Sequence, residues 1–141
     1  PTMQTRQPLD DEDTARLEAQ RNWVRGHFEP QSQHLYSTLD EKLRLLDTML
    51  AERWIERHET VKLQCLGVSL GDALVQGAGL SWVMVEDEYG RDPALELRGT
   101  SILLFPLTMI SKRVEKGEDV DVRSMYSGLC EKIRELASMG G

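Results

Sequence analysis

The sequence predicts an α+β fold in which three N-terminal helices precede a three-stranded antiparallel meander and two C-terminal helices. Apolar residues recur at three- and four-residue steps before residue 77 and again after residue 106, whereas short runs rich in valine and leucine fill the stretch between them. The 141 residues, 40% of them hydrophobic, can bury one core without disulfides. We therefore expect a flexible leader over residues 1–9 and a single domain over residues 10–138.

Two helices are expected in the first part of the chain. Asp10 can cap the first helix, whose opening turn carries three acidic residues that favour the positive end of the helix dipole. This helix should end before Pro30, because proline disfavours a helical predecessor. Thr38 and Glu41 have the spacing of a capping box, which predicts that the second helix begins there. Its core face is a stripe of four leucines, Leu39, Leu43, Leu46 and Leu50.

The third helix, expected over residues 60–76, is the candidate centre of the core, because its apolar residues spread around most of its circumference. Gly67 and Gly71 lie one turn apart and let a neighbouring element approach the backbone closely. With Ser69 they spell the G-x-S-x-G pattern of a hydrolase nucleophile elbow. That fold needs a histidine after the serine, whereas all three histidines precede it, so tight packing is the favoured interpretation.

The meander and the last two helices follow. Three short apolar runs, separated by turn residues, predict the strands: 80–85, 94–97 and 101–105. Pro106 suits the first turn of the fourth helix, which Gly117 ends. Asp121 can cap the fifth helix, whose apolar residues again repeat at three- and four-residue steps.

Charge and cysteine content restrict the partners and the compartment. The 24 acidic residues outnumber the 17 basic ones, so the net charge of -7 repels nucleic acid and anionic membrane surfaces and favours a protein with a basic surface. Cys65 and Cys130 fall among apolar helical residues as free thiols, and the polar start lacks a signal-peptide pattern, which favours the cytoplasm. Residues 63–85 carry one charge, Asp72, but its central position disfavours a membrane-spanning helix.

Motifs for metals and cofactors are not recognisable in the sequence. His27, His34 and His58 form no pair three to five residues apart, and the two cysteines lack zinc-site spacing. No glycine-rich phosphate loop precedes a helix with the required lysine. We therefore expect no cofactor, no metal ligand and no assigned catalytic residue.

One turn concentrates polar chemistry, because four carboxylates, a tyrosine and an arginine lie within residues 86–92. Such a cluster could bind a hard cation or shift the pKa of a carboxylate enough for acid or base work. The favoured alternative is an acidic hairpin tip held by local bonds. Two adjacent cations on the next helix could reach these carboxylates if that helix packs beside the hairpin. The candidate binding residues are Asp87, Glu88, Tyr89, Arg91, Asp92, Lys112 and Arg113.

The run from Trp82 to Glu118, WVMVEDEYGRDPALELRGTSILLFPLTMISKRVEKGE, resembles a bacterial family known as domain of unknown function 3806. The most specific elements are the EDEYG turn with Asp92 and Pro93, the segment 99–106 and the segment 108–113. The resemblance implies a small bacterial, cytosolic protein. It implies no activity and supplies no catalytic residue.

Three functional hypotheses follow. The first is a non-enzymatic protein-binding or regulatory module whose acidic surface and meander edge recognise another protein, an immunity-type role being one version. The second is a metal-dependent or acid/base enzyme that uses the acidic turn over residues 86–92. The third is a homodimer whose remaining apolar faces cover each other across a two-fold axis.

Overall fold

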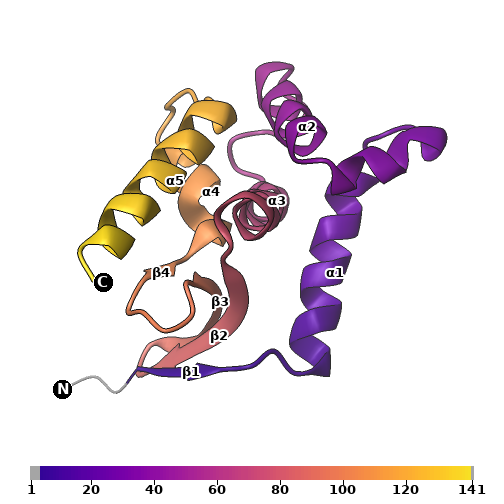
Figure 1. The fold of residues 1–141 in the computed structure, drawn as a ribbon. Helices are drawn as coiled ribbons and strands as arrows, with labels where there is room; N and C mark the ends of the chain where they lie inside the picture. The colour runs from indigo at the N-terminus through magenta and orange to yellow at the C-terminus, as the bar shows by residue number, and fades with distance from the viewer. Residues whose placement is uncertain (1–3, 141) are drawn as a thin grey trace.

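One long helix, α3 (Thr60–Ala78), lies at the centre of the molecule, and helices and sheet pack around it (Figure 1). The computed structural model describes residues 4–140. Most of α3 between Leu63 and Leu74 is buried, which confirms the predicted central helix. Its start is different, because Val61 is 73% exposed rather than part of the core. The other α-helices are α1 (Asp11–Arg25), α2 (Leu39–Ala51), α4 (Met109–Glu115) and α5 (Val122–Ser138).

The sheet has four antiparallel strands in the order β1-β2-β3-β4, one more than the expected meander. The extra strand comes from the predicted leader, where Arg6 pairs with Val85; residues 1–3 lie outside the described range. A three-residue polar strand carries too short an alternation to be recognised in the sequence, and it is formed by backbone pairing with the edge of β2. The strands are β1 (Thr5–Gln7), β2 (Ser81–Asp87), β3 (Gly90–Glu96) and β4 (Leu103–Leu104).

The β2–β3 hairpin is longer than predicted. Asp92 and Pro93 have turn-like composition, but they pair with Val85 and Met84 and so continue β3. The turn itself therefore shrinks to the two residues between Asp87 and Gly90. The last strand, in contrast, is only two residues long instead of residues 101–105.

The predicted start of α1 is confirmed. The Asp13 backbone N–H donates to Asp10 Oδ1 at 2.8 Å, and the Asp10 backbone N–H donates to Asp13 Oδ2 at 2.9 Å, which forms a reciprocal capping box. The helix ends at Arg25, and an unexpected 3-10 helix, η1 (Pro30–Ser37), follows.

The predicted start of α2 is also confirmed, but the prediction of a capping box there is wrong. Thr38 occupies the N-cap position without a side-chain capping bond. The Glu41 carboxylate instead accepts from Arg44 one turn later in the helix. The Thr38 backbone N–H, which a capping box would pair with Glu41, donates to the Leu35 carbonyl at 2.9 Å.

The glycine pair of α3 packs as the sequence indicated. A Cβ on Gly67 would lie 2.5 Å from the Leu107 carbonyl oxygen, in the 3-10 helix η2 (Pro106–Thr108). A Cβ on Gly71 would lie 2.5 Å from the Trp82 ring of β2. The close approach of neighbouring atoms to the backbone of α3, from η2 at Gly67 and from the Trp82 ring at Gly71, explains both glycines without a catalytic role. Among residues 4–140, no helix is long and apolar enough to cross a membrane.

Candidate functional site

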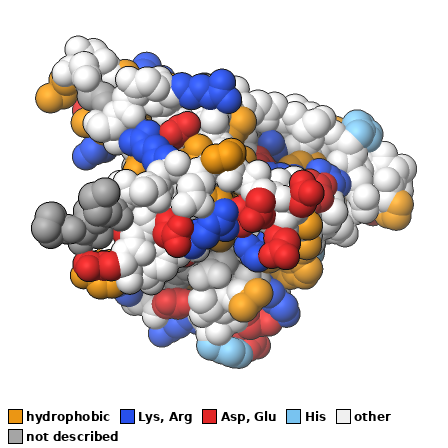
Figure 2. Space-filling model, turned by 90° about the horizontal axis from the view of Figure 1, so that it is seen from below, with side chains coloured by type: hydrophobic (Ala, Val, Ile, Leu, Met, Phe, Trp, Pro, Cys, Tyr) orange, Lys and Arg blue, Asp and Glu red, His pale blue; other side chains and the backbone are white. Residues whose placement is uncertain are grey.

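The acidic hairpin tip is the first candidate from the sequence. Tyr89 stands 86% exposed at the end of the hairpin, and its backbone N–H donates to Asp87 Oδ1 at 2.8 Å. Asp92 lies on β3 with an exposed side chain. Figure 2, seen from the side of β1 and the beginning of α1, shows acidic and basic side chains alternating across this face. Within the described part of the chain, no group of three or more His, Cys, Asp or Glu side chains is arranged to hold a metal ion.

Arg91 belongs to a different contact. Its guanidinium donates to both carboxylate oxygens of Asp13, at 2.6 and 2.7 Å, and to Gln7 Oε1 at 3.3 Å. The Arg91 bonds, with the Asp10 backbone N–H, hold the pKa of the Asp13 carboxyl well below its usual range. Arg91 thus joins the sheet to the first turn of α1 rather than stabilising the tip.

Lys112 and Arg113 lie exposed on α4, which packs mainly on α3 and η2. Over residues 4–140, no ion pair joins either cation to Asp87 or Asp92. Within the described residues, the predicted contacts of these two cations with Asp87 and Asp92 are therefore not formed.

A buried network around Asp72 accounts for the serine of the G-x-S-x-G pattern. Tyr36 Oη lies 2.9 Å from Ser69 Oγ and donates to Asp72 Oδ2 at 2.7 Å. Asp72 also accepts from Arg21, at 2.5 and 2.8 Å, and from Trp82 Nε1 at 3.1 Å. Burial, followed by the Asp72 charge, raises the pKa of Tyr36 well above its usual range. With Ser69 fully buried, this network joins α1, η1, α3 and β2 rather than meeting a substrate.

Lys42 is a further buried charge that the sequence did not reveal. It is only 4% exposed, its Nζ donates to Gln76 Oε1 at 3.0 Å, and it lies 4.8 Å from the centre of the Tyr36 ring. Burial lowers the pKa of the Lys42 ammonium. The one sequence signal for this cluster was Asp72, the single charge in a long apolar stretch. A buried charge of this kind requires polar or oppositely charged partners.

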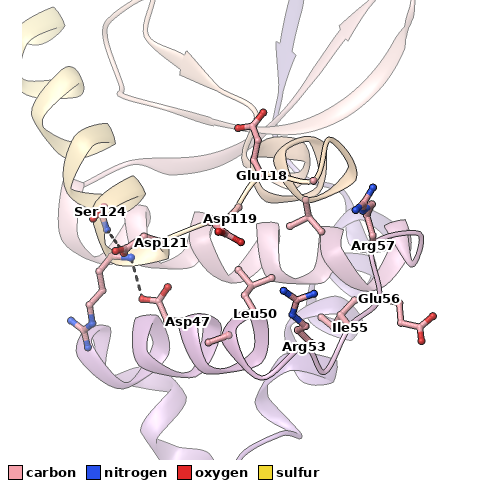
Figure 3. A pocket seen from close by; sticks show the side chains of 15 residues that line it. Asp47, Leu50, Arg53, Ile55, Glu56, Arg57, Glu118, Asp119, Asp121 and Ser124 are labelled. Atoms are coloured by element: carbon pink, nitrogen blue, oxygen red, sulfur yellow. Dashed lines mark hydrogen bonds between the residues drawn. The ribbon is translucent and has the colours of Figure 1, made fainter.

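A cleft of about 1010 Å³ opens between the end of α2, the connection over residues 52–58 and the connection from α4 to α5 (Figure 3). Apolar side chains from three of these segments line it, including the buried Ile55. The apolar lining consists of Leu50, Ala51, Ile55, Val114 and Val120.

Arg53, on one side of the cleft, has an unusual backbone. Its φ is +55°, directly after the C-cap residue Glu52 of α2. The Arg53 backbone N–H donates to the Leu50 carbonyl at 3.2 Å, and the Trp54 backbone N–H donates to the Met49 carbonyl at 3.0 Å. These two bonds define a Schellman motif, whose left-handed position is normally glycine.

Arg57 lies on the same side, with its guanidinium against Gly117. Within residues 4–140, neither Arg53 nor Arg57 makes a side-chain hydrogen bond or an ion pair. Both arginines are exposed, so the cleft contains two guanidinium groups open to an incoming anion.

Acidic residues from α2 and from the α4–α5 connection also line the cleft, but two of their carboxylates are already engaged. Asp47 accepts from the Val122 backbone N–H at 2.6 Å, and Asp121 accepts from the Ser124 backbone N–H at 3.0 Å. Both therefore cap the beginning of α5. Asp119 remains exposed across the cleft from the arginines (Figure 3).

Sequence reasoning missed this cleft. Arg53 and Arg57 fall in a stretch that resembles an ordinary charged connection. One signal was present: the leucine stripe of α2 ends without a glycine or asparagine near residue 53, where a helix commonly has one. The convergence of residues 47–57 and 114–124 depends on how α2 and α5 pack on α3, which local patterns do not show.

Comparisons with known proteins place this geometry in context. The family model described as "Domain of unknown function (DUF3806)" matches residues 42–126, a range that contains the whole cleft lining. A crystal structure from Bacteroides thetaiotaomicron VPI-5482 has the same fold, with a TM-score of 0.67 and 15% sequence identity. The match covers 92% of this chain and 47% of the other, so the chain spans about half the length of that protein. No curated protein matches.

Proposed function

We propose that this chain, which belongs to the DUF3806 family, is a non-enzymatic binding module. It takes a segment of another protein into the cleft between α2 and the α4–α5 connection. The observation that carries this proposal is the pairing of an apolar lining with two exposed guanidinium groups that make no polar contact within residues 4–140. Apolar centres with charged margins are typical of protein interfaces.

The composition of the cleft favours a polypeptide over a small molecule. Small-molecule sites enclose about 300–1,000 Å³ and are lined mainly by apolar and aromatic side chains. This cleft, at about 1010 Å³, lies at the upper end of that range, and its lining includes no aromatic residue. Charges of both signs also face it, which suits a chain segment that offers charges of both signs.

The contacts of the side chains whose pKa values are shifted favour a binding function over catalysis. The pKa values of Asp13, Tyr36 and Lys42 depart from their ordinary ranges, but each of these side chains is buried and bonded to a neighbouring element. In the acidic turn, Arg91 is engaged by Asp13. An acid/base or metal-dependent enzyme built on residues 86–92 stays a hypothesis.

The net charge of -7 supports a partner whose surface is basic overall. Such a partner is attracted over distances of about one Debye length, roughly 8 Å at physiological salt, and is then oriented by short-range contacts in the cleft. A regulatory or immunity-type role would use this combination of fast association and local specificity.

Site-directed photo-cross-linking in the native host tests the binding proposal. A photoreactive phenylalanine analogue is placed at Glu118, which lines the cleft and is exposed, and in a control protein at Val61, which is 73% exposed on α3. We expect a discrete protein adduct from position 118 and none of that mass from position 61.

A steric variant then ties the adduct to the cleft. Ala51 is exposed on the cleft wall, so Ala51→Trp fills the cleft without disturbing the core. We expect an unchanged melting temperature and loss of the adduct. Identical adducts from positions 118 and 61, or an adduct that survives Ala51→Trp, would overturn the proposal.

A further inference from the structure

The left-handed backbone at Arg53 differs from every other such position in the described chain. Positive φ angles otherwise occur only at glycines, namely Gly79, Gly90, Gly99, Gly117 and Gly140. Gly79 ends α3 and Gly117 follows α4, so this chain uses glycine where other helices end in the same conformation. At the end of α2 an arginine takes the strained conformation instead. Strain retained at one position indicates that its side chain has a role.

The geometry indicates what that role is. The Schellman bonds at Leu50 and Met49 fix the backbone of Arg53, and its side chain lies in the cleft (Figure 3). Arg57, from the following connection, lies on the same side. Glycine at position 53 would remove the strain but also the guanidinium group.

A carboxylate is the chemical group that fits this pair best. The planar guanidinium fork matches the two oxygens of a carboxylate. A doubly charged phosphate suits the cleft less well, because Asp47, Asp119 and Asp121 line it as well. A singly charged group has the smaller repulsion from these acids.

We propose that Arg53 and Arg57 form a carboxylate-recognition site that anchors an acidic side chain, or the C-terminal carboxylate, of the polypeptide bound in the cleft. This inference rests on the proposed function and adds the group that the partner must present. It places the specificity of the module in the connection after α2 rather than in the acidic hairpin.

Titration with short peptides, followed by NMR of the arginine Nε–H groups and the backbone amides, tests the site. Acetyl-Leu-Glu-Leu-amide carries a side-chain carboxylate, acetyl-Leu-Gln-Leu carries only a terminal one, and acetyl-Leu-Gln-Leu-amide carries none. Inorganic phosphate is the fourth probe. We expect one or both carboxylate peptides to shift the Nε–H signals of Arg53 and Arg57, and the neutral peptide and phosphate to leave them unchanged. Exposed Arg98 is the control for non-specific pairing.

Variants of the two arginines separate binding from folding. Arg53→Gly and Arg57→Ala should each weaken binding of the carboxylate peptide about tenfold, the effect of losing one charge-assisted contact. Arg98→Ala should leave it unchanged. Arg53→Gly should also raise the melting temperature, so its loss of binding has no explanation in misfolding.

The outcomes distinguish this inference from the proposed function. If the neutral peptide shifts the amides of Leu50, Ile55 and Val120 as strongly as the acidic one, or Arg98 shifts equally, the carboxylate site is overturned and the binding cleft stands. A stronger response to phosphate than to the carboxylate peptides also overturns it. If no peptide shifts any cleft amide and position 118 gives no adduct, both proposals fail.

Discussion

At the scale of single residues, the largest departures from the expected pattern are a left-handed arginine and a buried lysine. Arg53 occupies a position that glycine would take at lower free energy, whereas Lys42 buries an ammonium group against Tyr36 and Gln76. Both cost stability unless a partner compensates. The structure supplies that partner for Lys42 within the described chain, and we propose that a ligand supplies it for Arg53.

Replacing Arg53 with glycine should stabilise the protein. Glycine adopts positive φ without the Cβ clash, so the free energy of unfolding should rise by about 1 kcal/mol. Urea denaturation of Arg53→Gly and of Glu52→Gly measures this change. Glu52 is the right-handed C-cap residue, so its replacement should give no comparable gain. A loss of stability in Arg53→Gly would show that its side chain stabilises the free protein.

Tyr36→Phe tests the network around Asp72. The change removes the hydroxyl that bridges Ser69 and Asp72 and leaves Ser69 Oγ buried without its bond to Tyr36. The free energy of unfolding should fall by about 1–3 kcal/mol, the cost of an unsatisfied buried polar group. Tyr89→Phe at the exposed hairpin tip is the matched control and should change little. Equal effects of the two variants in thermal denaturation would contradict a structural role for the network.

At the scale of elements, α3 organises the molecule because it lacks side chains where its neighbours come closest. Gly67 faces the backbone of η2, and Gly71 faces Trp82 of β2. An α-helix that gives up propensity at Gly67 and Gly71 gains close packing with elements on different sides. The same two glycines belong to the G-x-S-x-G pattern of a nucleophile elbow. The same local sequence therefore fits either a tightly packed helix or a catalytic turn.

A pair of glycine-to-alanine variants separates packing from helix propensity. In Gly67→Ala the new Cβ would meet the Leu107 carbonyl at 2.5 Å, so the clash should outweigh the propensity gain and destabilise the protein by about 1–3 kcal/mol. In Gly128→Ala on α5, no atom lies within 4 Å of the new Cβ, and stability should rise by up to about 1 kcal/mol. Chemical denaturation compares the two. Stabilisation by Gly67→Ala would mean that η2 can move away at little cost.

At the scale of the whole molecule, polar contacts between distant segments join the helices to the sheet and to one another. Arg91 and Asp13 are 78 positions apart, and Arg21 and Asp72 are 51 apart. The first pair joins β3 to the beginning of α1, and the second joins α1 to α3. The cleft belongs to the same scale, because its two sides come from the end of α2 and from the α4–α5 connection.

The Arg91–Asp13 contact predicts a defined pH dependence. Because folding lowers the pKa of Asp13, this carboxyl stabilises the folded state above its ordinary pKa of 3.8, and the contribution is lost as the pH falls below that value toward the folded pKa. The stability difference between the wild type and Asp13→Asn should therefore be largest at neutral pH and shrink in acid. Asp92→Asn, at an exposed position, is the control. A difference that grows in acid would contradict this linkage.

Part of the fold followed from the sequence alone. We predicted those features that depend on side chains within about four positions of one another. They are the capped starts of α1 and α5, the start of α2, the buried α3 and the β2–β3 hairpin. Family resemblance over the C-terminal half was confirmed by the match to residues 42–126. The acidic segment 86–92 contains the β2–β3 turn, as predicted, but most of its residues belong to the two strands, and its binding role stays a prediction.

Tertiary structure alone decided the remaining features. The formation of β1 and the burial of Lys42 depend on which surfaces meet after the helices pack on α3. The conformation of Arg53 is local, but its meaning depends on the cleft that residues 114–124 complete. The physical reason is the distance along the chain over which each effect acts. Periodicity and capping depend on residues within a few positions of one another. Strand pairing, burial and cleft formation join groups tens of positions apart, and local sequence patterns do not show which of these groups will meet.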